Sequence, residues 1–86
     1  MVHNLKCWPE YFTYVESGAK PFEVRKNDRN YLEGDILILH EWDQRTGVYT
    51  GRELLRTVTH VFDLYDIPGD VWRGTGYVVL GLGKEV

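Results

Sequence analysis

Lys20, Glu23 and Arg25 are the residues of this sequence whose types and spacing best support chemistry. They lie in the segment Gly18–Arg29, where six charged side chains surround only two large apolar ones. Lysine supplies a point charge for a phosphate, and arginine supplies a planar fork that binds phosphate or stacks on a base. A carboxylate accepts N–H groups from a base edge such as that of cytosine. These residue types indicate a binding site.

A short helix is expected to precede this segment. Pro9 suits a first helical turn, and Ser17-Gly18 is typical of a helix end. Between them apolar residues recur at helical spacing, which predicts a two-turn helix with an aromatic buried face. The residues expected on that face are Trp8, Tyr11, Phe12 and Val15.

After Gly18 the pattern changes from helical to alternating. Side chains alternate along a strand, so Phe22 and Val24 should share one face, and Glu23 and Arg25 the other. We expect the apolar pair to face the core and the charged pair to face away from it. An exposed ion pair is worth roughly 0–1 kcal/mol. The substitution Arg25→Ala is therefore expected to weaken nucleotide or RNA binding with little change in Tm.

Strand patterns fill most of the remaining chain. The polar segment Asp43–Gly47 predicts a hairpin turn, and the Thr50-Gly51-Arg52 triplet is compatible with a β-bulge. The segment Asp63–Thr75 is expected to be a loop over a barrel mouth. One helix and about five strands predict a single α+β domain, a small β-barrel, over residues 1–86. The later strands are expected at Ile36–Trp42, from Val48, at Leu54–Phe62 and at Gly76–Leu82.

Composition limits the partners that such a domain can have. The net charge is −3, but residues 1–30 carry five basic and four acidic side chains, whereas residues 31–86 carry five and nine. An anionic partner should therefore meet a local patch, and a short single strand is favoured over a long duplex. Cys7 is the only cysteine, and no metal-ligand spacing is present. We expect a soluble cytoplasmic protein without membrane segment, metal or cofactor.

Four further residues are candidate contacts. Arg29 extends the basic segment, and Trp42 and Tyr49 flank the hairpin turn, where they could stack on a base. Arg52 follows a glycine that permits close approach of a ligand. Each also has a structural interpretation, as a solvated turn charge or as hairpin packing.

The pattern Gly18-x-Lys20-x-x-Glu23-x-Arg25 resembles the signature of ASCH domains, small β-barrels of the PUA-like superfamily. A group of short bacterial and phage proteins within it is closer still. The further marks are His3-x-Leu5-Lys6, Tyr11-Phe12, Phe22–Arg29, Gly34-Asp35, Glu41-Trp42 and Tyr49-Thr50-Gly51-Arg52. The resemblance is specific over residues 3–52, while the C-terminal half matches only as generic strands.

The resemblance implies a barrel with a cleft beside the helix and RNA or a nucleotide as ligand. A related bacterial group hydrolyses N4-acetylcytidine with the signature lysine, a threonine three residues later and a distant glutamate. Lys20 matches that lysine, but Glu23 occupies the threonine position, and no glutamate occurs between Glu53 and Glu85. Loop acids that could replace the distant glutamate are Asp63, Asp66 and Asp70.

Three functions remain open at this point. The leading hypothesis is a module that binds RNA or a modified nucleotide through Lys20, Glu23 and Arg25. The second is a small amidohydrolase on N4-acylated cytidine, with Lys20 and Glu23 as catalytic residues. The third is an accessory module that binds a protein partner through exposed aromatic residues.

Overall fold

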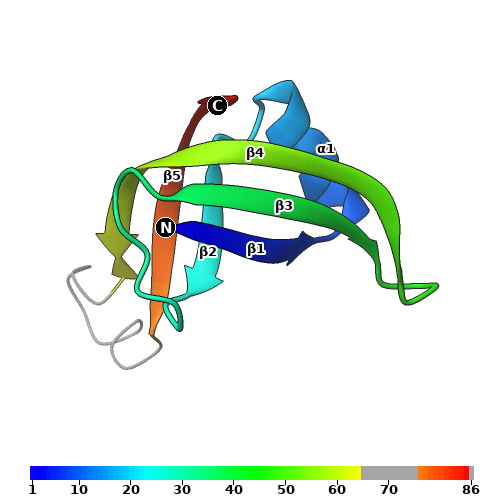
Figure 1. Ribbon diagram of the computed structural model, residues 1–86, viewed down its shortest axis with the longest axis horizontal. Helices are drawn as coiled ribbons and strands as arrows, with labels where there is room; N and C mark the ends of the chain where they lie inside the picture. The colour runs from blue at the N-terminus through cyan, green and yellow to red at the C-terminus, as the bar shows by residue number, and fades with distance from the viewer. Residues whose placement is uncertain (65–75, 86) are drawn as a thin grey trace.

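The computed structural model describes residues 1–64 and 76–85. This part of the chain forms a small α+β fold with one helix and one five-stranded sheet, which confirms the predicted class. The sheet has the order β1-β3-β4-β5-β2 and curls into a half-barrel (Figure 1). β1 and β3 are parallel, and the other pairs are antiparallel. The elements are β1 (Val2–Cys7), α1 (Pro9–Ser17), β2 (Phe22–Lys26), β3 (Ile36–Asp43), β4 (Val48–Asp63) and β5 (Tyr77–Glu85).

Local turn chemistry is confirmed at two glycines. Helix α1 ends at Gly18, whose φ of 83° is left-handed and whose N–H donates to the carbonyl of Val15. Gly47 has a φ of 72° and donates to the carbonyl of Asp43, closing the β3–β4 hairpin. In the described residues no helix is long and apolar enough to cross a membrane.

In the N-terminal region one strand was not predicted and one expectation was wrong. The first element is the strand β1, whose inward residues alternate as His3, Leu5 and Cys7. A histidine among them conceals the alternation in the sequence. Trp8 does not share the buried helix face, because it is the N-cap residue with an extended backbone. Phe12 and Val15 are buried, whereas Trp8 and Tyr11 are exposed.

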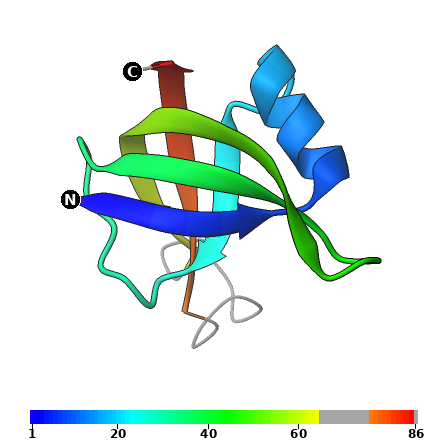
Figure 2. The ribbon, with the colours of Figure 1, turned by 45° about the vertical axis from the view of Figure 1, so that its right-hand side comes forward.

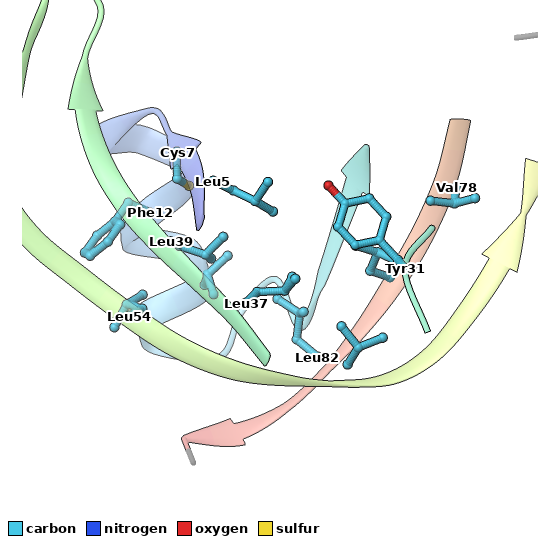
Figure 3. Packing of buried hydrophobic residues seen from close by; sticks show 12 residues of the cluster. Leu5, Cys7, Phe12, Tyr31, Leu37, Leu39, Leu54, Val78 and Leu82 are labelled. Atoms are coloured by element: carbon cyan, nitrogen blue, oxygen red, sulfur yellow. The ribbon is translucent and has the colours of Figure 1, made fainter. Parts of the chain in front are cut away.

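The core fills the concave side of the curled sheet (Figure 3). Helix α1 lies at one side of the sheet and contributes Phe12 and Val15 to the core (Figure 2). Leu37, Leu39 and Leu80 are fully buried, and each such side chain contributes about 2 kcal/mol through its burial.

Strand β2 faces the opposite way from the prediction. Phe22 and Val24 are 40% and 47% exposed, whereas Glu23 is 3% exposed. The cause lies in β5, where Val78 and Leu80 point into the core. Leu80 is opposite Glu23 and Val78 is opposite Arg25, and residues opposite each other in an antiparallel pair share a face. The β5 register therefore turns both charged side chains of β2 inward.

A polar cluster around Asp35 joins the start of β1 to the start of β3. The Asp35 carboxylate is buried and accepts hydrogen bonds from the amino group of Met1, at 2.9 Å, and from the backbone N–H of Leu32. His3 Nε2 lies 2.8 Å from its second oxygen, and the His3 ring meets the edge of Tyr31. These hydrogen bonds, with that from His3 the strongest cause, hold the pKa of Asp35 well below its usual range.

The depressed pKa predicts how stability depends on pH. The folded chain resists protonation of Asp35 more than the unfolded chain does, so this contribution is present above about pH 5 and is lost in stronger acid. The substitution Asp35→Asn should lower the free energy of unfolding at pH 7, with a smaller difference from wild type at about pH 3. Urea titrations of both proteins at the two pH values measure this. An equal difference at both would show that the ionised carboxylate is not the stabilising group.

Candidate functional site

The two edge strands of the half-barrel, β1 and β2, meet along a seam that side chains close. Arg25 Nη2 donates to the carbonyl of Lys6 at 2.6 Å, and Arg29 Nη1 donates to the carbonyl of Asn4 at 3.0 Å. β1 pairs with β3 and β2 pairs with β5, so the strand ladders do not join the two edges. Figure 2 shows β2 passing behind β1 at this side of the sheet. The seam is therefore held by guanidinium groups in place of a strand ladder.

Lys20, Glu23 and Arg25 converge at one end of this seam. Lys20 Nζ lies 3.1 Å from Glu23 Oε1, and Arg25 Nε donates to Glu23 Oε2 at 2.9 Å. The Glu23 side chain is 5% exposed, and those of Lys20 and Arg25 are 22% and 25% exposed. They line a cavity of about 280 Å³, which we call the carboxylate pocket. Its lining residues are Cys7, Tyr11, Lys20, Glu23, Val24 and Arg25.

The end of α1 places Lys20 over this pocket. Gly18 reverses the chain, and the Lys20 N–H donates to the carbonyl of Tyr14. The Lys20 ammonium then lies 5.3 Å from the ring centroids of both Tyr11 and Phe22. Pro21 accepts a hydrogen bond from the Leu82 N–H, which continues the contact of β2 with β5.

Glu23 is therefore not part of an exposed ion pair. Its carboxylate is shared between two cations, and Arg25 also holds the edge of β1. This overturns the basis for expecting an unchanged Tm in Arg25→Ala, because the contacts of Arg25 are structural as well as electrostatic.

Cys7 lines the carboxylate pocket and is a buried free thiol. Burial, with a smaller contribution from the charge of Glu23, raises the pKa of Cys7 to about 11. Since thiolates are the nucleophilic form, Cys7 is a neutral and unreactive group near pH 7.

A second, smaller cavity of about 160 Å³ continues the seam on the other side of Arg25. We call it the basic pocket. Arg25 lines both pockets, so the two adjoin along the seam. The lining residues of the basic pocket are Leu5, Arg25, Lys26, Asp28, Arg29 and Tyr31.

The predicted hairpin residues Trp42 and Tyr49 line neither pocket. They are cross-strand partners with ring centroids 4.8 Å apart in an edge-to-face arrangement. The ammonium of Lys6 lies 4.0 Å from the Trp42 ring centroid. These rings pack on one another, and the structure does not bring them to Lys20.

Arg52 also stands apart from the pockets. Its Nη2 donates to Glu16 at 2.7 Å, its Nη1 lies 3.5 Å from the buried carboxylate of Glu41, and its guanidinium is 4.8 Å from the Phe12 ring centroid. Thr50 donates to the other Glu41 oxygen. The register between β3 and β4 shifts between His40 and Trp42, opposite the Thr50–Arg52 triplet where a bulge was considered. Arg52 thus ties α1 to the hairpin.

The substitution Arg52→Ala is expected to lower Tm and to leave nucleotide or RNA affinity unchanged, because its partners are all structural. Thermal melts and binding titrations on the same preparations measure both. A variant with reduced affinity and an unchanged Tm would show that Arg52 contacts the ligand.

The match to known proteins covers this whole arrangement. Residues 2–82, which include the seam and both pockets, match the family model described as "Domain of unknown function (DUF3850)". The chain belongs to this family. It is also similar to the "Uncharacterized 12.9 kDa protein in GpA 3'region" of Escherichia phage P2, with 51% identity over 65 residues. That match covers 76% of this chain and 58% of the phage protein, so this DUF3850 chain spans little more than half of that relative's length.

Of the three loop acids considered from the sequence, the structure describes Asp63, which lines neither pocket. Asp63 is exposed at the end of β4, while Asp66 and Asp70, with most of the loop predicted over a barrel mouth, lie outside the described residues. Among residues 1–64 and 76–85, no group of three or more metal-ligating side chains is found.

Sequence reasoning missed several contributors to this site in the DUF3850 domain, among them Cys7, Tyr11, Tyr31 and the carbonyls of Asn4 and Lys6. Leu5 and Cys7 alternate with polar residues, which is a weak signal for an inward thiol because His3 interrupts the apolar pattern. A carbonyl that accepts from a distant arginine leaves no sequence signal.

A larger cavity of about 470 Å³ lies between the end of α1 and β5. Its lining combines apolar and main-chain groups with Glu16, which Arg52 engages, and Arg56, which donates to the carbonyl of Leu55. The seam brings more charged groups together, so we assign the candidate site to the seam.

Proposed function

We propose that this DUF3850 domain is an ASCH-type, PUA-like module that binds short single-stranded RNA or a modified nucleotide along the seam. The observation that carries the proposal is the convergence of Lys20, Glu23 and Arg25 on one pocket, with Glu23 buried. β2 buries a carboxylate while exposing Phe22 and Val24. Such a departure from the ordinary apolar pattern is typical of functional sites.

The carboxylate pocket has the groups that recognise a base. Glu23 offers acceptors to base N–H groups, and the Arg25 fork is held in place by its other contacts. Tyr11 lines the pocket and stacks on Trp8, with ring centroids 6.2 Å apart and an interplanar angle of 21°. Both rings are 47% exposed. Stacking of a base on such a platform contributes about 1–3 kcal/mol.

The charge distribution favours a short anionic ligand. Around the seam, basic side chains outnumber acidic ones in a chain whose net charge is −3. A long duplex would meet the acidic remainder of the surface, whereas a short single strand can lie within the seam. The basic residues that line the two pockets are Lys20, Arg25, Lys26 and Arg29, and the acidic ones are Glu23 and Asp28.

Fluorescence anisotropy with a labelled short single-stranded RNA of mixed sequence tests the proposal. Wild type should bind with an affinity that falls as salt rises. Lys20→Ala should bind more weakly, and Arg45→Ala, which removes an exposed charge on the hairpin turn, should bind like wild type. Absence of binding at low salt would contradict RNA recognition and favour a protein partner.

A hydrolase is the second candidate, favoured by one observation. The Lys20 ammonium and the Glu23 carboxylate are 3.1 Å apart in a pocket, which suits proton transfer to and from a bound acylated base. Incubation of wild type and Lys20→Ala with N4-acetylcytidine, followed by chromatography, separates the two functions. Product formed by wild type and not by the variant would make the protein an amidohydrolase.

A further inference from the structure

The basic pocket carries more positive charge than its neighbours neutralise. Arg25, Lys26 and Arg29 line it together with one acid, Asp28. The Asp28 side chain is 63% exposed, and its nearest approach to Arg29 is 3.9 Å. An exposed pair at this distance is weak and leaves the guanidinium largely uncompensated.

Neutral acceptors hold one end of each guanidinium group, and the Nε of Arg25 also donates to the Glu23 carboxylate, which balances part of the Arg25 charge. Arg29 donates to the carbonyl of Asn4, and Arg25 donates to that of Lys6. A carbonyl orients a guanidinium without cancelling its charge, and each fork keeps further N–H groups. The side-chain entropy of Arg25 and Arg29 is therefore already lost on folding. Binding of an anion then costs less conformational entropy.

The turn that carries these residues is also fixed. The Asn27 N–H donates to the carbonyl of Gly76, and the Asn27 side chain accepts from the N–H of Tyr31. Asp28 N–H donates to the carbonyl of Lys26. The basic side chains thus extend from a hydrogen-bonded turn.

Tyr31 supplies an independent indication of a ligand. Its side chain is almost fully buried, with 3% exposed, and it lines the basic pocket. No hydrogen bond joins its hydroxyl to another residue of the described chain, and Figure 3 shows this oxygen on the side of the ring toward Leu5. Burial raises the pKa of the Tyr31 phenol. The hydroxyl is therefore a neutral donor near pH 7, beside two arginines.

We infer that the basic pocket is a phosphate subsite formed by Arg25, Lys26, Arg29 and the Tyr31 hydroxyl. This rests on the proposed function of the adjoining carboxylate pocket, with which it shares Arg25. The base lies in the carboxylate pocket and its phosphate in the basic pocket. The ligand class is then a nucleotide or an oligonucleotide, and a free nucleoside fills only half of the site.

Titration of the isotope-labelled protein followed by NMR tests this inference. The probes are the four common ribonucleosides, their 5′- and 3′-monophosphates, and inorganic phosphate. At least one monophosphate should bind about tenfold more tightly than its nucleoside, since charge-assisted hydrogen bonds to phosphate are the difference. Its signal changes should include Lys26, Arg29 and Tyr31. Inorganic phosphate alone should change the same signals at higher concentration.

Two variants change the basic pocket and keep the Arg25 and Arg29 hydrogen bonds that hold the seam. Lys26→Ala removes an exposed charge, and Tyr31→Phe removes only a hydroxyl. Each should reduce the advantage of the monophosphate over its nucleoside by about threefold while leaving nucleoside affinity unchanged. Arg45→Ala, an exposed cation remote from the seam, is the charge-matched control and should retain the full advantage.

The outcomes separate this inference from the proposed function. Equal affinity for nucleoside and monophosphate, with changes confined to the carboxylate pocket, would overturn the phosphate subsite and leave nucleotide-base recognition standing. A monophosphate advantage that survives both variants would also overturn it. No binding of any nucleoside, nucleotide or short RNA would overturn both proposals.

Discussion

Glu23→Ala is expected to destabilise the domain by about 3 kcal/mol and to abolish ligand binding. Removal of one partner from a buried ion pair typically costs 3–5 kcal/mol, and the lower end applies because both cations keep partial contact with solvent. For a domain of this size the loss corresponds to a fall in Tm on the order of 15 °C. Thermal melts followed by circular dichroism measure it.

Glu33→Ala is the matched control for this experiment. It also removes one carboxylate, but the Glu33 side chain is 64% exposed and its ion pair is with His60, whose side chain is 65% exposed. Its Tm should stay close to that of wild type. A Glu23→Ala protein that melts like the control would contradict the buried arrangement of Lys20, Glu23 and Arg25.

Arg25→Ala is expected to affect stability and binding together. The substitution removes the hydrogen bonds to Glu23 and to the Lys6 carbonyl and should cost about 2 kcal/mol. It also removes a cation shared by both pockets, so RNA affinity should fall about tenfold or more. The slope of log affinity against log salt should decrease by about 0.7, as expected for one lost phosphate contact to a single strand.

Arg25→Lys makes the prediction specific. It retains the charge but not the planar fork that reaches Glu23 and Lys6 at once. We expect Arg25→Lys to restore the salt dependence of RNA binding. Most of the stability lost in Arg25→Ala should remain lost in Arg25→Lys. If Arg25→Ala reduced Tm but left RNA affinity and its dependence on salt unchanged, Arg25 would stabilise the seam without contacting RNA.

The features predicted correctly from the sequence are those that local chemistry decides. A glycine after an amphipathic run ends α1 at Gly18, and the polar Asp43–Gly47 segment closes a hairpin, because both depend on residues within one turn. The association of Lys20 with Glu23 and Arg25 also follows from spacing, since all three lie within six residues.

The errors arose where distant segments decide the outcome. The inward face of β2 depends on its pairing with β5, more than fifty residues away, whose Val78 and Leu80 must fill the core. Alternation alone gave two possible faces for Glu23, and hydrophobicity selected the wrong one. The hydrogen bond from Arg25 to the Lys6 carbonyl depends on how far the sheet curls, and no local sequence pattern encodes that curvature.

The exposure of Phe22 and Val24 has a physical consequence for the function. Apolar side chains on the outer face forgo part of the burial energy that the prediction assigned to them. In return, β2 presents Glu23 and Arg25 to the seam. The positions of Glu23 and Arg25 are thus set by the register of the sheet.

Mapping the binding surface by NMR tests the central claim most directly. A short single-stranded RNA of mixed sequence is titrated into the isotope-labelled protein, and changes in the backbone and arginine Nε signals are recorded. We predict changes concentrated on residues 20–31 and on β1 from Asn4 to Cys7, with the Arg25 Nε among the largest. Changes confined to the hairpin of Trp42, Tyr49 and Arg52, or no change at all, would contradict the seam as the binding site.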